Sequence, residues 1–172
     1  SAEAFFESPT FANLLELVAG GPYSAQAGAR ADAKAASDVA WPLPVELRNK
    51  LLFSLEAWDG SRPTRDRLVA ALNTAGTRTP LFWVCQGNVT FRDLAESFQA
   101  DQPLYVFRSG EGLIKYTEDE IQSFALRYVA EIAEVWQEGP LFIGGNCQGA
   151  VLALAMAQHL LRRGRHIPLL IL

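Results

Sequence analysis

Short apolar runs alternate with longer segments of helical spacing over most of the sequence, and this alternation restricts the fold more than any other feature. The apolar runs predict strands over 81–85, 104–107, 141–145 and 167–172. The segments between them predict helices over 91–98, 118–137 and 149–162. Strands that alternate with helices of this length form a parallel sheet. We therefore predict an α/β fold with a mostly parallel sheet and helices on both of its faces.

The segment before this alternation predicts a helix followed by a strand. Pro44 can begin a helix, and Asp59-Gly60 can end it. The apolar face expected for this helix is Val45, Leu47, Leu51, Leu52, Leu55 and Trp58. The run 68–72 is interpreted as a strand that forms, with 81–85, two strands around a turn, although 68–72 could also be helical.

The start of the long helix at 118–137 carries its own signal. Thr117 is followed three residues later by Glu120. A threonine and a glutamate at this spacing can each bond to the other's backbone N–H group, which is a capping box. We therefore predict that Thr117 caps this helix.

Charge and composition exclude several classes of protein. The net charge is −4, whereas a nucleic-acid binder needs clustered basic residues. Arg162, Arg163 and Arg165 do cluster, but at an expected helix end, where cations favour the helix dipole. No apolar run is long enough for a membrane span, and the first residues lack the basic region of a signal peptide. Two cysteines without a C-x-x-C pair indicate neither a disulfide framework nor zinc, so we expect free thiols and a cytoplasmic protein.

The pentapeptide Gly145-Asn146-Cys147-Gln148-Gly149 lies between a predicted strand and a predicted helix. This is the context of the G-x-S-x-G nucleophile elbow, here with cysteine in place of serine. A strained tight turn would lift Cys147 above the sheet, and Gly145 and Gly149 would let strand and helix pack closely. The helix start would point N–H groups at the site, which favours a thiolate or an oxyanion. The alternatives are a glycine turn with an inert cysteine, or a loop that holds phosphate.

A second candidate segment, C-Q-G-N, follows the strand at 81–85. In proteins with a nucleophile elbow, the loop after this strand donates one N–H group to the oxyanion hole, and the residue after the nucleophile donates the other. The candidates here are Gln86 or Gly87, together with Gln148. A plain glycine turn is the alternative. Cys85 is interpreted as a small core or rim residue rather than a second nucleophile.

A nucleophile of this kind also needs a base, usually a histidine that an acid holds in place. The two histidines are His159 and His166. His159 lies twelve residues beyond Cys147, which is about 18 Å along a helix. His166 falls between that helix and the next strand. We expect neither to reach Cys147 and interpret both as surface or rim histidines.

The first forty residues differ in composition from the rest. Residues 3–18 have an apolar spacing that predicts one short amphipathic helix, and FFESPTFANLLELV is similar to the last helical segment of an acyl- or peptidyl-carrier domain. Residues 21–40 are rich in alanine and glycine, and they predict a flexible linker that is poorly packed or ordered only by another chain.

Four segments together resemble one known family: PLFWVCQGN (80–88), DQPLY (101–105), EGPLFIGGNCQGA (138–150) and the closing PLLIL. They are similar to the first part of the type I thioesterase domains, α/β-hydrolases at the end of nonribosomal peptide and polyketide synthetases. The resemblance implies four units. These are a carrier-domain tail (1–20), a linker (21–40), a helical lead-in (41–66) and the amino-terminal part of a thioesterase domain (67–172), so the α/β-hydrolase-like fold would be incomplete at its carboxyl side.

The resemblance also implies an activity. The family moves an acyl or peptidyl chain from the phosphopantetheine of a carrier domain onto its nucleophile, then releases it by hydrolysis or cyclisation. The expected partners are that carrier domain and other synthetase modules, with no directly bound cofactor, no metal, no nucleic acid and a possible homodimer. Two residues depart from the family pattern: Cys147 replaces the usual serine, and Cys85-Gln86 replaces a frequent H-P.

In this family the acid commonly follows the strand that ends this chain, and the catalytic histidine lies far beyond it. The 172-residue chain is therefore expected to be inactive by itself. Two other readings stay open. One is a docking or scaffolding fragment with an inert Cys147, and the other is a cysteine-dependent polyester synthase, against which the carrier-like tail and the linker argue.

Overall fold

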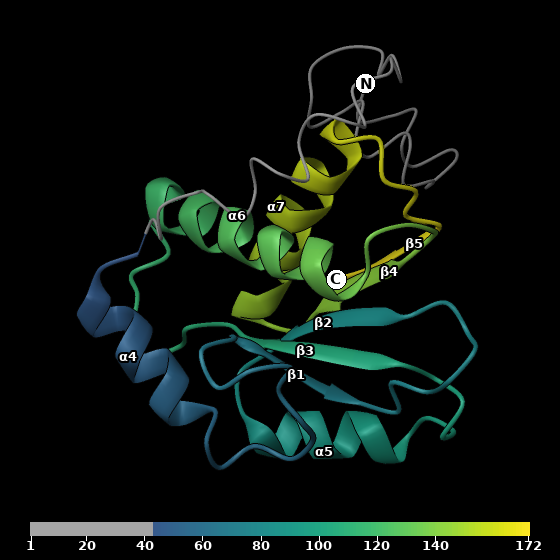
Figure 1. Cartoon of the computed structure of the whole chain (residues 1–172). Helices are drawn as coiled ribbons and strands as arrows, with labels where there is room; N and C mark the ends of the chain where they lie inside the picture. Colours follow the sequence, from purple (N-terminus) through teal and green to yellow (C-terminus); the bar gives the residue numbers. More distant parts are fainter. Residues whose placement is uncertain (1–42) are drawn as a thin grey trace.

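The computed structural model describes residues 43–172, which build one sheet with helices on both sides (Figure 1). The elements in chain order are α4 (Val45–Ser54), β1 (Val69–Leu72), β2 (Leu81–Cys85), α5 (Asn88–Glu96), β3 (Leu104–Arg108), α6 (Glu118–Val135), β4 (Phe142–Gly145), α7 (Gln148–Arg162) and β5 (Leu169–Ile171). The strands lie in the order β1-β3-β2-β4-β5.

Strand pairing confirms the predicted parallel sheet. β2 is parallel to β3 and to β4, and β4 is parallel to β5. The central strands are buried on both faces, which explains why they are continuous apolar runs rather than alternating ones. Their side chains divide between two apolar clusters, one on each face of the sheet.

β1 is a strand, but its position corrects the expectation of two neighbouring strands around a turn. β1 pairs antiparallel with β3, which separates it from β2. The connection from β1 to β2 passes the amino end of β3, where the Thr77 N–H donates to the Asp101 carboxylate at 2.8 Å. A Cβ atom at Gly76 would lie 2.3 Å from the Asp101 carbonyl oxygen. This close approach leads the chain past β3 before β2 begins.

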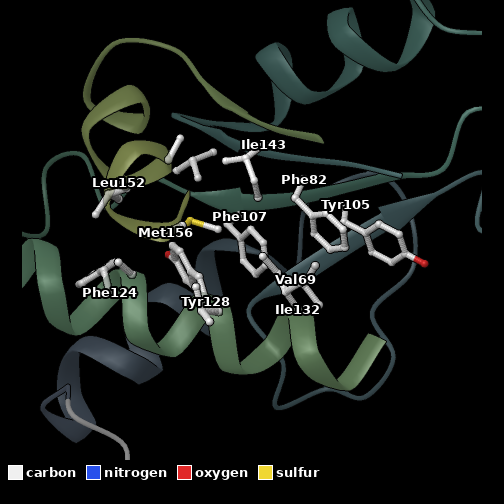
Figure 2. Close-up of a cluster of buried hydrophobic side chains, with 14 of the residues drawn as sticks. Val69, Phe82, Tyr105, Phe107, Phe124, Tyr128, Ile132, Ile143, Leu152 and Met156 are labelled. Carbon is white, nitrogen blue, oxygen red and sulfur yellow. The ribbon is translucent and has the colours of Figure 1, made fainter. Parts of the chain in front are cut away.

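The larger apolar cluster lies between the sheet and α6 and α7, and Figure 2 shows its central side chains. Phe107 and Tyr128 stack with their ring centroids 4.5 Å apart, and Phe124 meets Tyr128 edge-on at 5.7 Å. Leu51 of α4 and Leu55, which directly follows this helix, belong to the same cluster. The smaller cluster, around Phe91 of α5, covers the other face of the sheet. Helices on both faces were predicted and are confirmed.

The predicted capping box of α6 is confirmed. The Thr117 side chain accepts from the Glu120 N–H at 3.4 Å, and the Glu120 carboxylate accepts from the Thr117 N–H at 3.1 Å. All six apolar positions with helical spacing along this helix contribute to the large cluster: Phe124, Ala125, Tyr128 and Ile132 belong to it, and Ile121 and Val135 pack against it. The helix ends at Val135, two residues earlier than predicted.

Several element boundaries differ from the prediction. α5 begins at Asn88 rather than at residue 91, because the Asn88 amide exchanges hydrogen bonds with Asp59 and holds the first turn. α4 ends at Ser54 rather than near Trp58, since the Ser54 hydroxyl bonds to the Leu51 carbonyl at 2.7 Å. The predicted apolar face of α4 was also too wide, because it included Val45, which is 64% exposed.

The strands at the carboxyl side are shorter than the apolar runs that predicted them. β4 covers Phe142–Gly145 and β5 covers Leu169–Ile171. The predicted carrier tail (1–20) and linker (21–40) lie outside the described residues. Within residues 43–172, no helix is both long enough and apolar enough to cross a membrane.

Candidate active site at the carboxyl ends of β2 and β4

The strand order creates a natural place for a site. From β2 the chain turns through α5 to β3 on one side, and from β4 it turns through α7 to β5 on the other. α5 and α7 lie on opposite faces of the sheet (Figure 1). In open α/β sheets, ligands bind at such a switch point, beyond the carboxyl ends of the strands. The segments after β2 and β4 are the two that the sequence singled out.

Cys147 lies in the turn between β4 and α7, as predicted. Its backbone has φ 51° and ψ −125°, a conformation that a residue with a side chain adopts rarely. The turn is closed by a bond from the Gly149 N–H to the Asn146 carbonyl (2.8 Å) and one from the Ala150 N–H to the Cys147 carbonyl (3.0 Å). The cysteine side chain is exposed. The structure thus presents a free thiol on a strained turn at the carboxyl edge of the sheet.

The two glycines that flank Cys147 permit close packing of backbone on backbone. A Cβ atom at Gly145 would lie 2.4 Å from the Gly149 carbonyl oxygen. A Cβ atom at Gly149 would lie 2.1 Å from the Val84 carbonyl oxygen on β2. Both distances are far inside van der Waals contact, so any side chain at either position would push α7 away from the sheet.

Two side-chain hydrogen bonds connect β2 and its loop to the residues on either side of Cys147. The Trp83 Nε1–H donates to Asn146 Oδ1 at 3.3 Å. The Gln86 Nε2–H donates to Gln148 Oε1 at 2.7 Å, and both of these side chains are half-buried. Neither pairing was predicted from the sequence.

The Gln86 N–H group points toward the Cys147 side of β2. The Cys85 carbonyl, on the same peptide, accepts from the Ser109 N–H after β3 at 2.7 Å. The described residues contain no cis peptide bond, and the C=O and N–H groups of a trans peptide point in opposite directions. The Gln86 N–H is therefore directed away from β3, to the side where β4 ends.

Cys85 differs sharply from Cys147. Its side chain is buried on the α5 face, and its thiol donates to the Gly87 carbonyl with 3.6 Å between the heavy atoms. Burial raises the pKa of the Cys85 thiol to about 12, which the Gly87 contact and the Arg108 charge offset only in part. A thiol with this pKa is protonated at neutral pH and unreactive, in agreement with the prediction of a core residue.

Neither histidine lies beside Cys147. His159 is in the last turns of α7, about 17 Å along the helix axis from its first residue. Its Nε2 is 2.7 Å from Gln122 Oε1 on α6, and burial, then the charges of Arg162 and Arg163, lower its pKa. His166 is exposed beyond the end of α7. Within residues 43–172, no group of three histidine, cysteine or acidic side chains could hold a metal ion.

The side-chain pairings that the sequence reasoning missed do leave a signal. Gln86 follows the last residue of β2, and its partner Gln148 lies three residues beyond the end of β4. Because neighbouring parallel strands end at the same edge, polar residues just beyond them are placed to meet. The signal becomes usable only when β2 and β4 are known to be neighbours.

A mostly parallel sheet with a strained turn at the carboxyl edge, between a central strand and a helix, is the architecture of the α/β-hydrolases. The family model described as "Thioesterase domain" matches residues 84–172. The chain belongs to the thioesterase domain family.

Known relatives agree with this family. Chondramide synthase cmdD of Chondromyces crocatus is 32% identical over 59% of this chain, and atromentin synthetase nps3 of Serpula lacrymans var. lacrymans is 29% identical over 64%. These matches span 3% and 12% of the two synthetases. Among solved structures, the NocB thioesterase domain in covalent complex with a fluorophosphonate nocardicin G analogue aligns with a TM-score of 0.50 at 27% identity. That alignment covers 59% of this chain and 46% of the solved chain, so this chain spans less than half of the solved domain.

Proposed function

We propose that this chain is the amino-terminal part of a domain that releases or cyclises an acyl or peptidyl chain carried as a thioester, with Cys147 as the nucleophile. The observation that carries the proposal is the exposed Cys147 thiol on a turn with φ 51° and ψ −125°. Strain of this kind persists only where surrounding structure enforces it, and it concentrates at functional sites. Here Gly145 and Gly149 enforce it through backbone contacts.

The proposed first step is a thiol–thioester exchange. The Cys147 sulfur attacks the carbonyl carbon of the thioester, and a new S–C bond gives a tetrahedral intermediate with a negative oxygen. The bond to the carrier sulfur then breaks, and the carrier thiol leaves with the proton that Cys147 lost. In the second step a water, hydroxyl or amine attacks the acyl group, and its proton passes to the departing Cys147 sulfur.

The tetrahedral oxygen needs hydrogen-bond donors, and the site has candidates. The Gln148 N–H is in the first turn of α7, where the first N–H groups have no partner within the helix. The Gln86 N–H points to the same side of β2. We assign these two groups as the oxyanion hole, in preference to the Gly87 N–H on the following peptide. Donors fixed in advance in this way stabilise developing negative charge.

The relatives support the choice of substrate. Two of them are named as synthetases or synthases, and the solved relative is a thioesterase domain trapped in a covalent complex. We propose a carrier domain and its acyl- or peptidyl-phosphopantetheine as the partner of this site. The position of Cys147 at the sheet edge is compatible with such a substrate. The exchange itself requires no cofactor.

Covalent labelling tests the proposal. The chain is incubated with an acyl-N-acetylcysteamine thioester, a short analogue of the phosphopantetheine arm, and digested for peptide mass spectrometry. We expect acyl modification at Cys147 and none at the buried Cys85, with the signal lost in Cys147→Ala. Alkylation of Cys147 by iodoacetamide without any acylation by the thioester would instead support a docking or scaffolding role.

A further inference from the structure

The Gln86–Gln148 side-chain hydrogen bond joins the two residues whose backbone N–H groups we assign to the oxyanion hole. Gln86 Nε2 lies 2.7 Å from Gln148 Oε1, which is a short distance for an amide pair. One partner belongs to the loop after β2, and the other to the first turn of α7. The side chains therefore link the two halves of the proposed oxyanion hole directly.

The loop after β2 has little other support on the side of Cys147. At Gly87, an added Cβ atom would find no heavy atom within 4 Å, so the space that a side chain would fill there is open. The peptide before Gln86 is held on its far side by the Ser109 N–H at 2.7 Å. Asn88, beyond Gly87, is held by Asp59, whose side chain is exposed. The side-chain amide of Gln86 connects the loop to the turn that contains Cys147.

The first turn of α7 is, by contrast, firmly placed. Gly149 packs on the Val84 carbonyl of β2, and the Leu152 side chain is fully buried in the large apolar cluster. The side-chain oxygen of Gln148 is thus a well-placed acceptor for the end of the long Gln86 side chain. Ordering the Gln86 side chain costs conformational entropy, and a bond to a well-placed partner offsets that cost.

We propose that Gln86 and Gln148 form a positioning pair, in which their side-chain hydrogen bond sets the spacing between the two N–H groups that stabilise the oxyanion. This inference rests on the proposed function. The pair does not touch the reacting atoms through its side chains. It acts on acylation, which passes through a tetrahedral oxygen, and not on alkylation, which does not.

The test compares the two reactions of Cys147 in the full chain. Gln86→Met and Gln148→Met each remove one side of the hydrogen bond, keep the side-chain length and leave the backbone N–H in place. Rates of acylation by the acyl-N-acetylcysteamine thioester and of alkylation by iodoacetamide are measured by mass spectrometry for both variants and for the double variant. Gln158→Met, on the same helix but remote from the turn, is the matched control.

We expect each single variant to acylate about tenfold more slowly, less than the roughly 100-fold or greater loss on removing an oxyanion donor outright. Alkylation rates should stay within about twofold of wild type, and the double variant should be no slower than either single variant, as expected for one shared interaction. Gln158→Met should react like wild type. Because the two single variants change different elements, misfolding of one still leaves the other to decide.

Other outcomes overturn the inference in separate ways. If wild type is acylated but both variants acylate at its rate, the pair has no positioning role and the proposed function stands. If acylation and alkylation slow equally, the hydrogen bond only maintains the fold around Cys147. If wild type is alkylated but never acylated, the proposed function fails and the positioning role fails with it.

Discussion

Gly149 shows how a single residue controls the site. An alanine in a helix is ordinarily about 1 kcal/mol more favourable than a glycine. At this position a Cβ atom would lie 2.1 Å from the Val84 carbonyl oxygen, which cannot move without disturbing β2. The steric clash therefore outweighs helix propensity. Gly149→Ala should destabilise the protein, whereas helix propensity alone predicts that it stabilises it.

We expect Gly149→Ala to lower the free energy of unfolding by about 1 to 3 kcal/mol, the range for forcing extra atoms into a packed region. Urea unfolding followed by circular dichroism measures this. Gly87→Ala is the matched control, because a Cβ atom there meets nothing within 4 Å and the backbone is extended. Equal stability of the two variants would contradict the packing described around Cys147.

Glu131, unlike Gly149, has surroundings that the sequence did not indicate. It is fully buried on α6, where its carboxylate accepts from the Leu68 N–H at 2.8 Å and pairs with Arg127 at 2.9 Å. Burial raises the pKa of Glu131 above its ordinary value of 4.5, although the Arg127 charge and these hydrogen bonds lower it in part.

A carboxyl group whose pKa is higher in the folded state contributes stability below its unfolded pKa and loses it as the pH rises through the folded pKa. The free energy of unfolding of wild type, measured relative to that of Glu131→Gln, should therefore fall as the pH is raised from about 4 toward 7. Urea unfolding of both proteins across this range measures the difference. A difference that grows with pH would show that Arg127, not burial, dominates at Glu131.

At the scale of elements, α6 is set by a local signal that the structure reproduces. Thr117 and Glu120 exchange hydrogen bonds at its start, and the capping geometry depends only on residues three apart. The boundaries of α4 and α5 were less accurate, because Ser54 and Asn88 act through hydrogen bonds that the apolar spacing does not reveal.

We expect Thr117→Ala to cost about 1 kcal/mol of unfolding free energy, the usual effect of removing a helix cap. Thr74→Ala, at an exposed threonine in the turn after β1, should change stability by less than about 0.5 kcal/mol. Thermal or urea unfolding of the two variants side by side makes the comparison. A cost as small for Thr117 as for Thr74 would mean that the capping box adds nothing to the packing of α6.

At the scale of the whole molecule, the two edges of the sheet differ. The outer side of β1 is partly covered, because Ser61 and Ala71 exchange two backbone hydrogen bonds of 2.9 and 2.8 Å. β5, at the other edge, exposes Leu169 (44%) and Ile171 (39%). An apolar strand edge of this kind is a template for pairing with another chain.

We therefore expect the 172-residue chain to self-associate, with a mean mass that rises with concentration in sedimentation experiments. Ile171→Lys should reduce this association, since charge on an edge strand opposes pairing. Val45→Lys, which replaces an exposed apolar residue on α4 instead, should leave it largely unchanged. Equal effects of the two substitutions would point to general hydrophobic attraction rather than to the β5 edge.

Turnover is also a property of the whole arrangement. Both imidazoles lie at or beyond the far end of α7, so Cys147 has no histidine within hydrogen-bond reach. We expect the chain to accept an acyl group slowly at Cys147 but to show no multiple turnover of acyl thioesters. Steady-state release of thiol, abolished by Cys147→Ala, would show that another group serves as the base.

The sequence by itself determined the features that depend on neighbouring residues. The parallel sheet, the cap of α6 and the strained turn at Cys147 follow from apolar spacing, a three-residue signal and the Gly145 and Gly149 flanks. Tertiary structure decided what distant segments do when they meet. The place of β1 beside β3, the burial that raises the pKa of Cys85, and the Gln86–Gln148 bond across 62 residues of chain all depend on strand order. Local patterns fix backbone conformation through short-range sterics, whereas strand order follows from how the whole core packs, and it decides which side chains share an edge.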